Sequence, residues 1–188
     1  DIHYWPGIKG RGSTAGFQAT MSFQYEHFFK ENINHFQMSV LIGNRLCTHA
    51  GVGNDFLKSV GFWKMDNADE SIISDYLNDL FLYKPNEFTF DGSYDRNNTG
   101  VIPSYYGDDD WQSPIWIRPK SLQRVNKNTD LKKNYIQIVG HTQQDHIDIK
   151  GKTTGGKYYY IDTLPSGEYL IDVDGEFSVD YCTIIKYI

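Results

Sequence analysis

The chain has 188 residues, the length of one ordinary domain, and its 39% hydrophobic and 22% charged residues are typical of a folded protein. A formal net charge of −6 argues against a general nucleic-acid partner and against an acidic membrane surface. No apolar run approaches the ~20 residues of a transmembrane helix. The two cysteines, Cys47 and Cys182, match no zinc-binding spacing. We therefore expect a cytoplasmic protein with no membrane partner and with reduced thiols in its core.

The first half of the chain predicts helices around one hairpin. An apolar stripe from Tyr25 to Phe36 indicates a helix that begins near Ser22. Two short apolar runs, 38–42 and 45–48, flank Gly43-Asn44 and predict a hairpin with a type II′ turn. Residues 53–62 favour a short helix. A stronger helix is predicted over 68–83, with Asn67 as its cap.

The second half predicts mainly strands. Residues 84–112 have no clear period, so we interpret them as a functional loop or an insertion. Residues 115–117 are apolar, and Pro119 indicates a turn. Strands are then expected over 135–139, 146–149, 157–162, 168–173 and 177–185, the last two joined by Asp174-Gly175. The order predicts a single α+β domain over residues 1–188, a layered αβ fold with a mixed or antiparallel sheet and flanking helices.

Three residues are candidates for a functional site. His49 and His141 each follow a predicted strand and have a glycine nearby, which is a common way to present a metal ligand or a general base. The alternative is that they are polar residues in ordinary turns. Arg118 lies between an aromatic and a proline-containing segment, and its guanidinium suits phosphate; a surface arginine that shields apolar residues is the alternative. Asp108-Asp109-Asp110 is expected to be a solvated acidic loop.

Four segments in this order resemble the C-terminal half of calcineurin-like metallophosphoesterases. They are Thr48-His49-Ala50-Gly51-Val52, Trp116-Ile117-Arg118-Pro119, Val139-Gly140-His141-Thr142 and Tyr160-Ile161-Asp162-Thr163. The branch that they resemble holds the bacterial and phage phosphatases related to phosphoprotein phosphatases and diadenosine tetraphosphatases. The resemblance implies an αββα sandwich, His49 and His141 as ligands of one metal ion, and Arg118 as a contact to substrate phosphate. It also implies two divalent ions, Mn, Fe or Zn, in the complete protein, and a phosphorylated small molecule or phosphoprotein as substrate.

The first half of such a family member carries three further motifs, GDxHG, GDxxDRG and GNH(D/E). They supply the other metal ligands, the bridging aspartate and the histidine that protonates the leaving group. None is complete here. Asp1 resembles the last residue of GNHD; the alternative, that Asp1-Ile2-His3 belongs to the first motif, is disfavoured because Tyr4 replaces its glycine. The chain thus corresponds to about half of a family member, and we expect it to be inactive as a phosphatase.

A binding function is the second hypothesis. In this interpretation the chain is a metal-free relative whose aromatic loop, residues 84–112, binds a protein or a ligand. We also expect the chain to self-associate, because strand 135–139 would present an apolar edge if neighbouring strands were missing.

Overall fold

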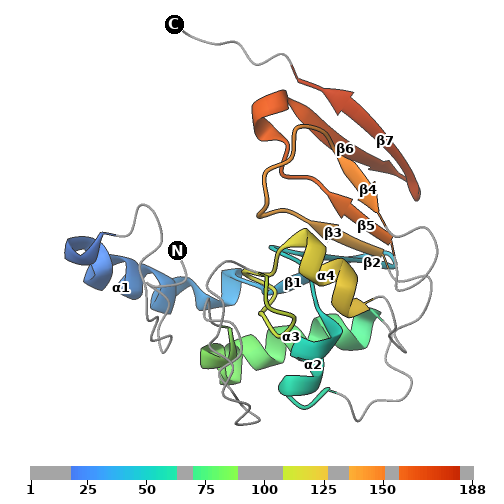
Figure 1. Ribbon diagram of the computed structural model, residues 1–188. Helices are drawn as coiled ribbons and strands as arrows, with labels where there is room; N and C mark the ends of the chain where they lie inside the picture. The colour runs from blue at the N-terminus through green and yellow to red at the C-terminus, as the bar shows by residue number, and fades with distance from the viewer. Residues whose placement is uncertain (1–17, 63–69, 89–107, 127–135, 151–156, 183–188) are drawn as a thin grey trace, which may run out of the picture.

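The computed structural model describes residues 18–62, 70–88, 108–126, 136–150 and 157–182. These residues form a mixed α+β fold in which one sheet is flanked by helices (Figure 1). The α-helices are α1 (Ser22–Asn32), α2 (Asn54–Ser59), α3 (Glu70–Tyr83) and α4 (Pro119–Asn126). Short 3-10 helices are η2 (Ala19–Met21), η3 (Ile33–His35), η5 (Pro85–Glu87) and η6 (Leu164–Ser166). The predicted layered αβ class is therefore confirmed.

Five strands form the main sheet in the order β1-β2-β3-β5-β4. Their bounds are β1 Ser39–Ile42, β2 Arg45–Thr48, β3 Ile136–Val139, β4 Asp148–Lys150 and β5 Lys157–Tyr160. Strands β2, β3 and β5 run parallel, whereas β1 and β4 are antiparallel to their neighbours. The expected apolar edge at 135–139 is wrong for the described strand, because β3 is paired on both sides and the edges of the sheet are β1 and β4.

Helices cover one face of this sheet and a hairpin lies on the other (Figure 1). Against the helical face, Val139, Tyr158 and Tyr160 pack with Leu122 and Val125 of α4. The hairpin consists of β6 (Glu168–Val173) and β7 (Glu176–Tyr181), and Phe177 of β7 contacts Tyr159 of β5. A second apolar cluster lies between α2, α3 and the β1–β2 hairpin. The parallel strands are therefore enclosed between two layers, as such strands require.

Several local predictions differ from the structure in detail. Pro119 is the first residue of α4 rather than a turn, a position where the missing N–H of proline is harmless. The α1 helix ends at Asn32. Its Phe28 is exposed and contacts the rings of Phe29 and Phe36, whereas Phe29 packs against the apolar cluster. Cys182 is exposed rather than in a core, whereas Cys47 is half-buried. The predicted Asn67 cap and most of the 84–112 loop lie outside the described residues.

None of the helices in the described ranges is both long and apolar enough to cross a bilayer.

Candidate functional site

The two candidate histidines meet at the carboxyl ends of β2 and β3. His49 directly follows β2, and His141 lies two residues beyond β3. Nε2 of His49 lies 2.9 Å from Nδ1 of His141, although the residues are 92 positions apart in sequence. The Gly140 N–H donates a 2.9 Å hydrogen bond to the His49 carbonyl, which extends the β2–β3 pairing to the histidines themselves. Ligands commonly bind at this end of parallel strands.

His141 has an unusual backbone conformation. Its φ is 67°, and the Thr142 N–H donates a 2.8 Å hydrogen bond to the Gly140 carbonyl across it. Together these define a three-residue γ-turn with positive φ at its centre, which is a rare and strained form. The turn ends the strand abruptly and directs the His141 ring toward His49. Strain of this kind in a non-glycine residue is characteristic of functional sites.

The loop that carries His49 is held by hydrogen bonds at Ala50 and at Gly51. The Ala50 N–H donates to the Pro114 carbonyl at 2.6 Å, and the Gly51 N–H donates to Oγ1 of Thr48 at 3.0 Å. Gly51 itself has φ 101°, and a Cβ there would lie 2.3 Å from Cδ2 of Leu122. A side chain at this position would therefore collide with α4 and would also strain the backbone.

Two buried amides hold the next residue of the loop, Val52. The Val52 N–H donates to Oε1 of Gln137 at 2.8 Å, while Nε2 of Gln137 and Nδ2 of Asn126 donate to the Val52 carbonyl at 3.1 Å and 3.0 Å. Gln137 is on β3 and Asn126 ends α4, and both side chains are buried. The site loop is thus connected to the central strand and to a helix by satisfied polar groups.

The surroundings favour neutral imidazoles. Burial is the largest cause that lowers the pKa of His141 to about 4, and the nearby charges of His49 and Arg118 add to it. Burial also lowers the pKa of His49, against a smaller opposing effect of Asp162. Both rings are therefore neutral at pH 7, which is the state that binds metal ions.

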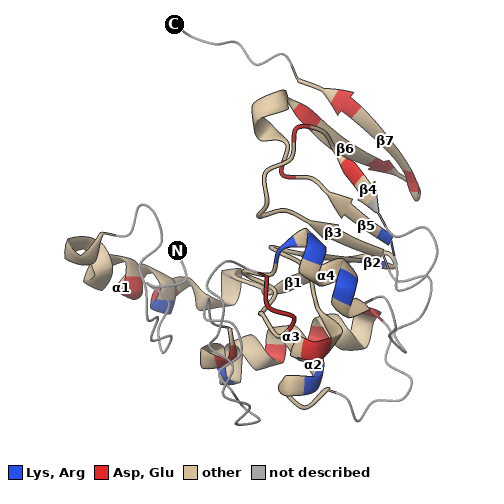
Figure 2. Ribbon diagram, in the orientation of Figure 1, with Lys and Arg blue, Asp and Glu red and all other residues tan. Residues whose placement is uncertain are grey.

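Arg118 lies beside the histidine pair. Its Nη1 donates a 3.1 Å hydrogen bond to Oγ1 of Thr142, and its Cζ lies 5.3 Å from the centre of the Trp116 ring. The same Trp116 ring is 5.1 Å from the ring of His141. Figure 2 shows further basic residues along α4, whereas acidic residues mark the β6–β7 hairpin. The three candidates named from the sequence therefore lie together at one end of the sheet.

Asp162 is a further polar residue at the carboxyl ends of the parallel strands. The sequence patterns assigned it no role. Asp162 lies two residues beyond β5, whose Tyr160 pairs with Val139 of β3, and its charge is near enough to His49 to oppose the lowering of that pKa. The Thr163 N–H donates a 2.9 Å hydrogen bond to the Ile161 carbonyl, so Asp162 is also at the centre of a γ-turn. Its position two residues after a buried strand was the available signal.

The histidine pair fits a shared metal ion in part. Two nitrogens bound to one ion at about 2.0–2.1 Å lie about 2.9–3.4 Å apart at common ligand angles, and the observed separation is 2.9 Å. Within the described ranges, however, no group of three or more His, Cys, Asp or Glu side chains completes a metal site. Structural sites generally use four ligands. The pair can therefore supply two ligands of a larger set.

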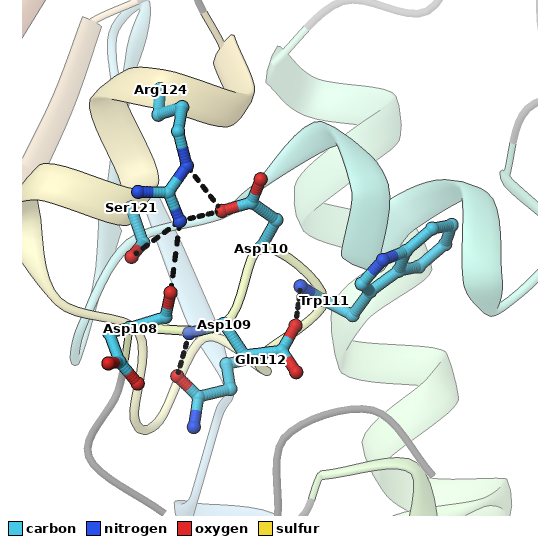
Figure 3. Close-up of polar contacts among 7 residues, drawn as sticks. All are labelled: Asp108, Asp109, Asp110, Trp111, Gln112, Ser121 and Arg124. Carbon is cyan, nitrogen blue, oxygen red and sulfur yellow. Dashed lines mark hydrogen bonds and ion pairs between the residues drawn. The ribbon is translucent and has the colours of Figure 1, made fainter. Parts of the chain in front are cut away.

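The acidic loop predicted at 108–110 is held by an arginine rather than simply solvated (Figure 3). The guanidinium of Arg124 in α4 binds the Asp110 carboxylate through Nε at 2.8 Å and also through Nη2. The same Nη2 donates to the Asp108 carbonyl at 2.9 Å. These contacts fix the end of the 84–112 segment just before the turn that carries Trp116. Of the remaining candidates, Asp1 lies outside the described residues.

Comparisons of the chain with protein-family models, with curated proteins and with solved structures gave no match.

Proposed function

We propose that the chain is the C-terminal portion of a metal-dependent phosphoesterase of the calcineurin-like type. The observation that carries this proposal is the convergence of His49, His141 and Arg118 at one end of three parallel strands. Each was named from a short sequence pattern, and the three patterns are far apart in the chain. On this proposal the β6–β7 hairpin belongs to the second sheet of an αββα sandwich.

The chemistry follows from the donor types. His49 and His141 would hold one divalent ion through Nε2 and Nδ1, since both rings are neutral at pH 7. Divalent ions such as Mn, Fe or Zn, when bound, polarise phosphoryl oxygens and activate water for attack. Arg118 would bind the phosphate of a phosphorylated small molecule or phosphoprotein, because its planar guanidinium matches phosphate oxygens.

The proposal includes an incomplete metal set. The described residues offer the two histidines. Among them, no carboxylate joins the pair in a group of three or more side chains that could hold a metal ion. We therefore expect the 188-residue chain to bind an ion weakly and not to turn over p-nitrophenyl phosphate with added Mn. A chain extended upstream is expected to do so if the extension supplies the missing ligands.

The first prediction tests the histidine pair by zinc or manganese titration calorimetry on the 188-residue chain. His49→Ala and His141→Ala should each weaken the affinity at least about tenfold, because each removes one of two ligands. His27→Ala is the matched control, since His27 is exposed on α1 and should leave the affinity unchanged. Equal affinity in all four proteins would contradict the metal assignment and favour the alternative of a binding module that uses the 84–112 loop.

A further inference from the structure

The guanidinium of Arg118 is held from two directions. From its face it contacts the Trp116 ring, with Cζ 5.3 Å from the ring centre. From its edge, Nη1 donates a 3.1 Å hydrogen bond to Oγ1 of Thr142. Thr142 directly follows His141, so the contact ties the arginine to the same γ-turn that orients the histidine.

The Trp116 ring is itself well fixed. The turn that carries it is closed by Trp116 N–H and Ile117 N–H, which donate to the Ser113 carbonyl at 3.0 Å and 3.2 Å. The indole packs against the larger apolar cluster between α2 and α3, while its other contacts reach His141 and Arg118. A residue that joins the core to two site residues can transmit the rigidity of the core to them.

We propose that Trp116 and Thr142 are positioning residues that fix the guanidinium of Arg118 beside His141 in the orientation that binds phosphate. This inference rests on the proposed function, which supplies the role of Arg118. An unrestrained arginine loses much side-chain freedom when it binds an anion, and one that is already held loses less. The contribution of Trp116 and Thr142 is therefore to phosphate affinity rather than to metal binding.

The test is a titration of the 188-residue chain with inorganic phosphate, followed by NMR, in six variants and the wild type. Trp116→Leu and Thr142→Val remove the two contacts, whereas Trp116→Phe and Thr142→Ser keep a ring and a hydroxyl. Arg118→Ala reports whether phosphate binding depends on the arginine at all. Trp111→Leu is the matched control, a tryptophan substitution in the loop before the site. The heteronuclear NOE of the Arg118 Nε–H group measures the order of the guanidinium in each variant that retains it.

We expect Trp116→Leu and Thr142→Val each to weaken phosphate binding about three- to tenfold and to lower the Arg118 NOE, with Phe and Ser restoring most of both. Trp111→Leu should change neither quantity.

If Arg118→Ala weakens binding but the Leu and Val variants bind like the wild type, the positioning role is overturned and the proposed function stands. If Arg118→Ala binds phosphate like the wild type, the proposed role of Arg118 fails. The phosphate-binding role of Trp116 and Thr142 then fails with it. Whatever the phosphate result, an unchanged NOE in both the Leu and Val variants overturns the positioning of the guanidinium. Thr142→Val keeps the test valid if Trp116→Leu does not fold.

Discussion

Among the described residues that are not glycine, two have positive φ, and they differ in kind. Asp174, with φ 51°, is in an Asp-Gly hairpin turn where that conformation is common. His141, with φ 67°, ends a buried parallel strand, where nothing about the strand itself requires it. A residue with a Cβ that is held in a sparsely populated backbone conformation of this kind costs about 1–3 kcal/mol. The surrounding hydrogen bonds must therefore hold His141 in this position.

This strain predicts an unusual order of stability. His141→Ala and His141→Gly both remove the imidazole, but glycine adopts positive φ without the steric cost. We expect His141→Gly to be about 0.5–1 kcal/mol more stable than His141→Ala, after allowance for the greater freedom of glycine in the unfolded chain. Urea unfolding of the two variants measures the difference. Asp145 is exposed and its φ is not positive, so Asp145→Ala should be more stable than Asp145→Gly. If the alanine variant is the more stable one at His141 as well, His141 is not strained.

The elements that sequence predicts well are those defined by local signals. Gly43, with φ 60°, and Asp174-Gly175, with φ 51° and 95°, form the two expected hairpin turns. Helix α4 was missed because its eight residues offer little periodicity and begin with a proline. Tertiary contacts of Leu122 and Val125 stabilise it instead. The histidines could be found because a strand end is a local feature. Their contact, the hold of Thr142 on Arg118 and the position of Asp162 depend on the parallel register, which no local pattern encodes.

The link between β3 and the site loop gives a prediction at the scale of an element. Gln137→Leu keeps the approximate volume of the side chain but leaves the Val52 N–H without its acceptor. We expect the free energy of unfolding to fall by about 1–3 kcal/mol, the cost of an unsatisfied buried donor. Gln143→Leu is the control, because that glutamine is exposed in the loop after β3. Equal unfolding midpoints for the two variants in urea would show that the Val52 contact contributes nothing.

At the scale of the whole molecule, the β6–β7 hairpin makes polar contacts at both of its ends, with the main sheet at one end and with the loop before β4 at the other. At one end Nη1 of Arg45 lies 3.1 Å from the Asp172 carboxylate, and the Arg45 guanidinium covers the Phe177 ring. At the other end the buried Glu168 carboxylate binds Nδ1 of His146 and the Ile147 N–H, each at 2.6 Å. His146 lies in the loop that begins at His141, so this second contact joins the hairpin to the loop after β3.

The Glu168–His146 contact predicts a pH dependence of stability. The hydrogen bond to Glu168 raises the pKa of His146 above its ordinary 6.5, and the bond from His146 lowers the pKa of Glu168 below 4.5. Asp145 adds to the first effect, and Tyr181 to the second. The contribution of the pair is therefore fully present between those ordinary values. It is lost as the pH rises through the raised pKa of His146 or falls through the lowered pKa of Glu168.

Urea unfolding from about pH 4 to pH 9 tests this linkage. The stability advantage of the wild type over His146→Ala should be largest near pH 5.5, about the middle of that window, and should shrink at alkaline pH. His35→Ala, in the exposed η3 turn, should show a difference that does not follow this profile. An advantage over His146→Ala that grows above pH 7 would contradict the ion pair.

The pairing of β2 with β3 also bears on how the chain folds. Thr48 and Val139 are neighbours in the sheet, yet α2, α3 and α4 all lie between them in sequence. The two hairpins close short loops and can form early, whereas this parallel pair requires the closure of a loop of almost half the chain. The two imidazoles therefore come together only when that late step is complete. Metal affinity in a refolding experiment would then report the arrival of the native topology rather than the formation of secondary structure.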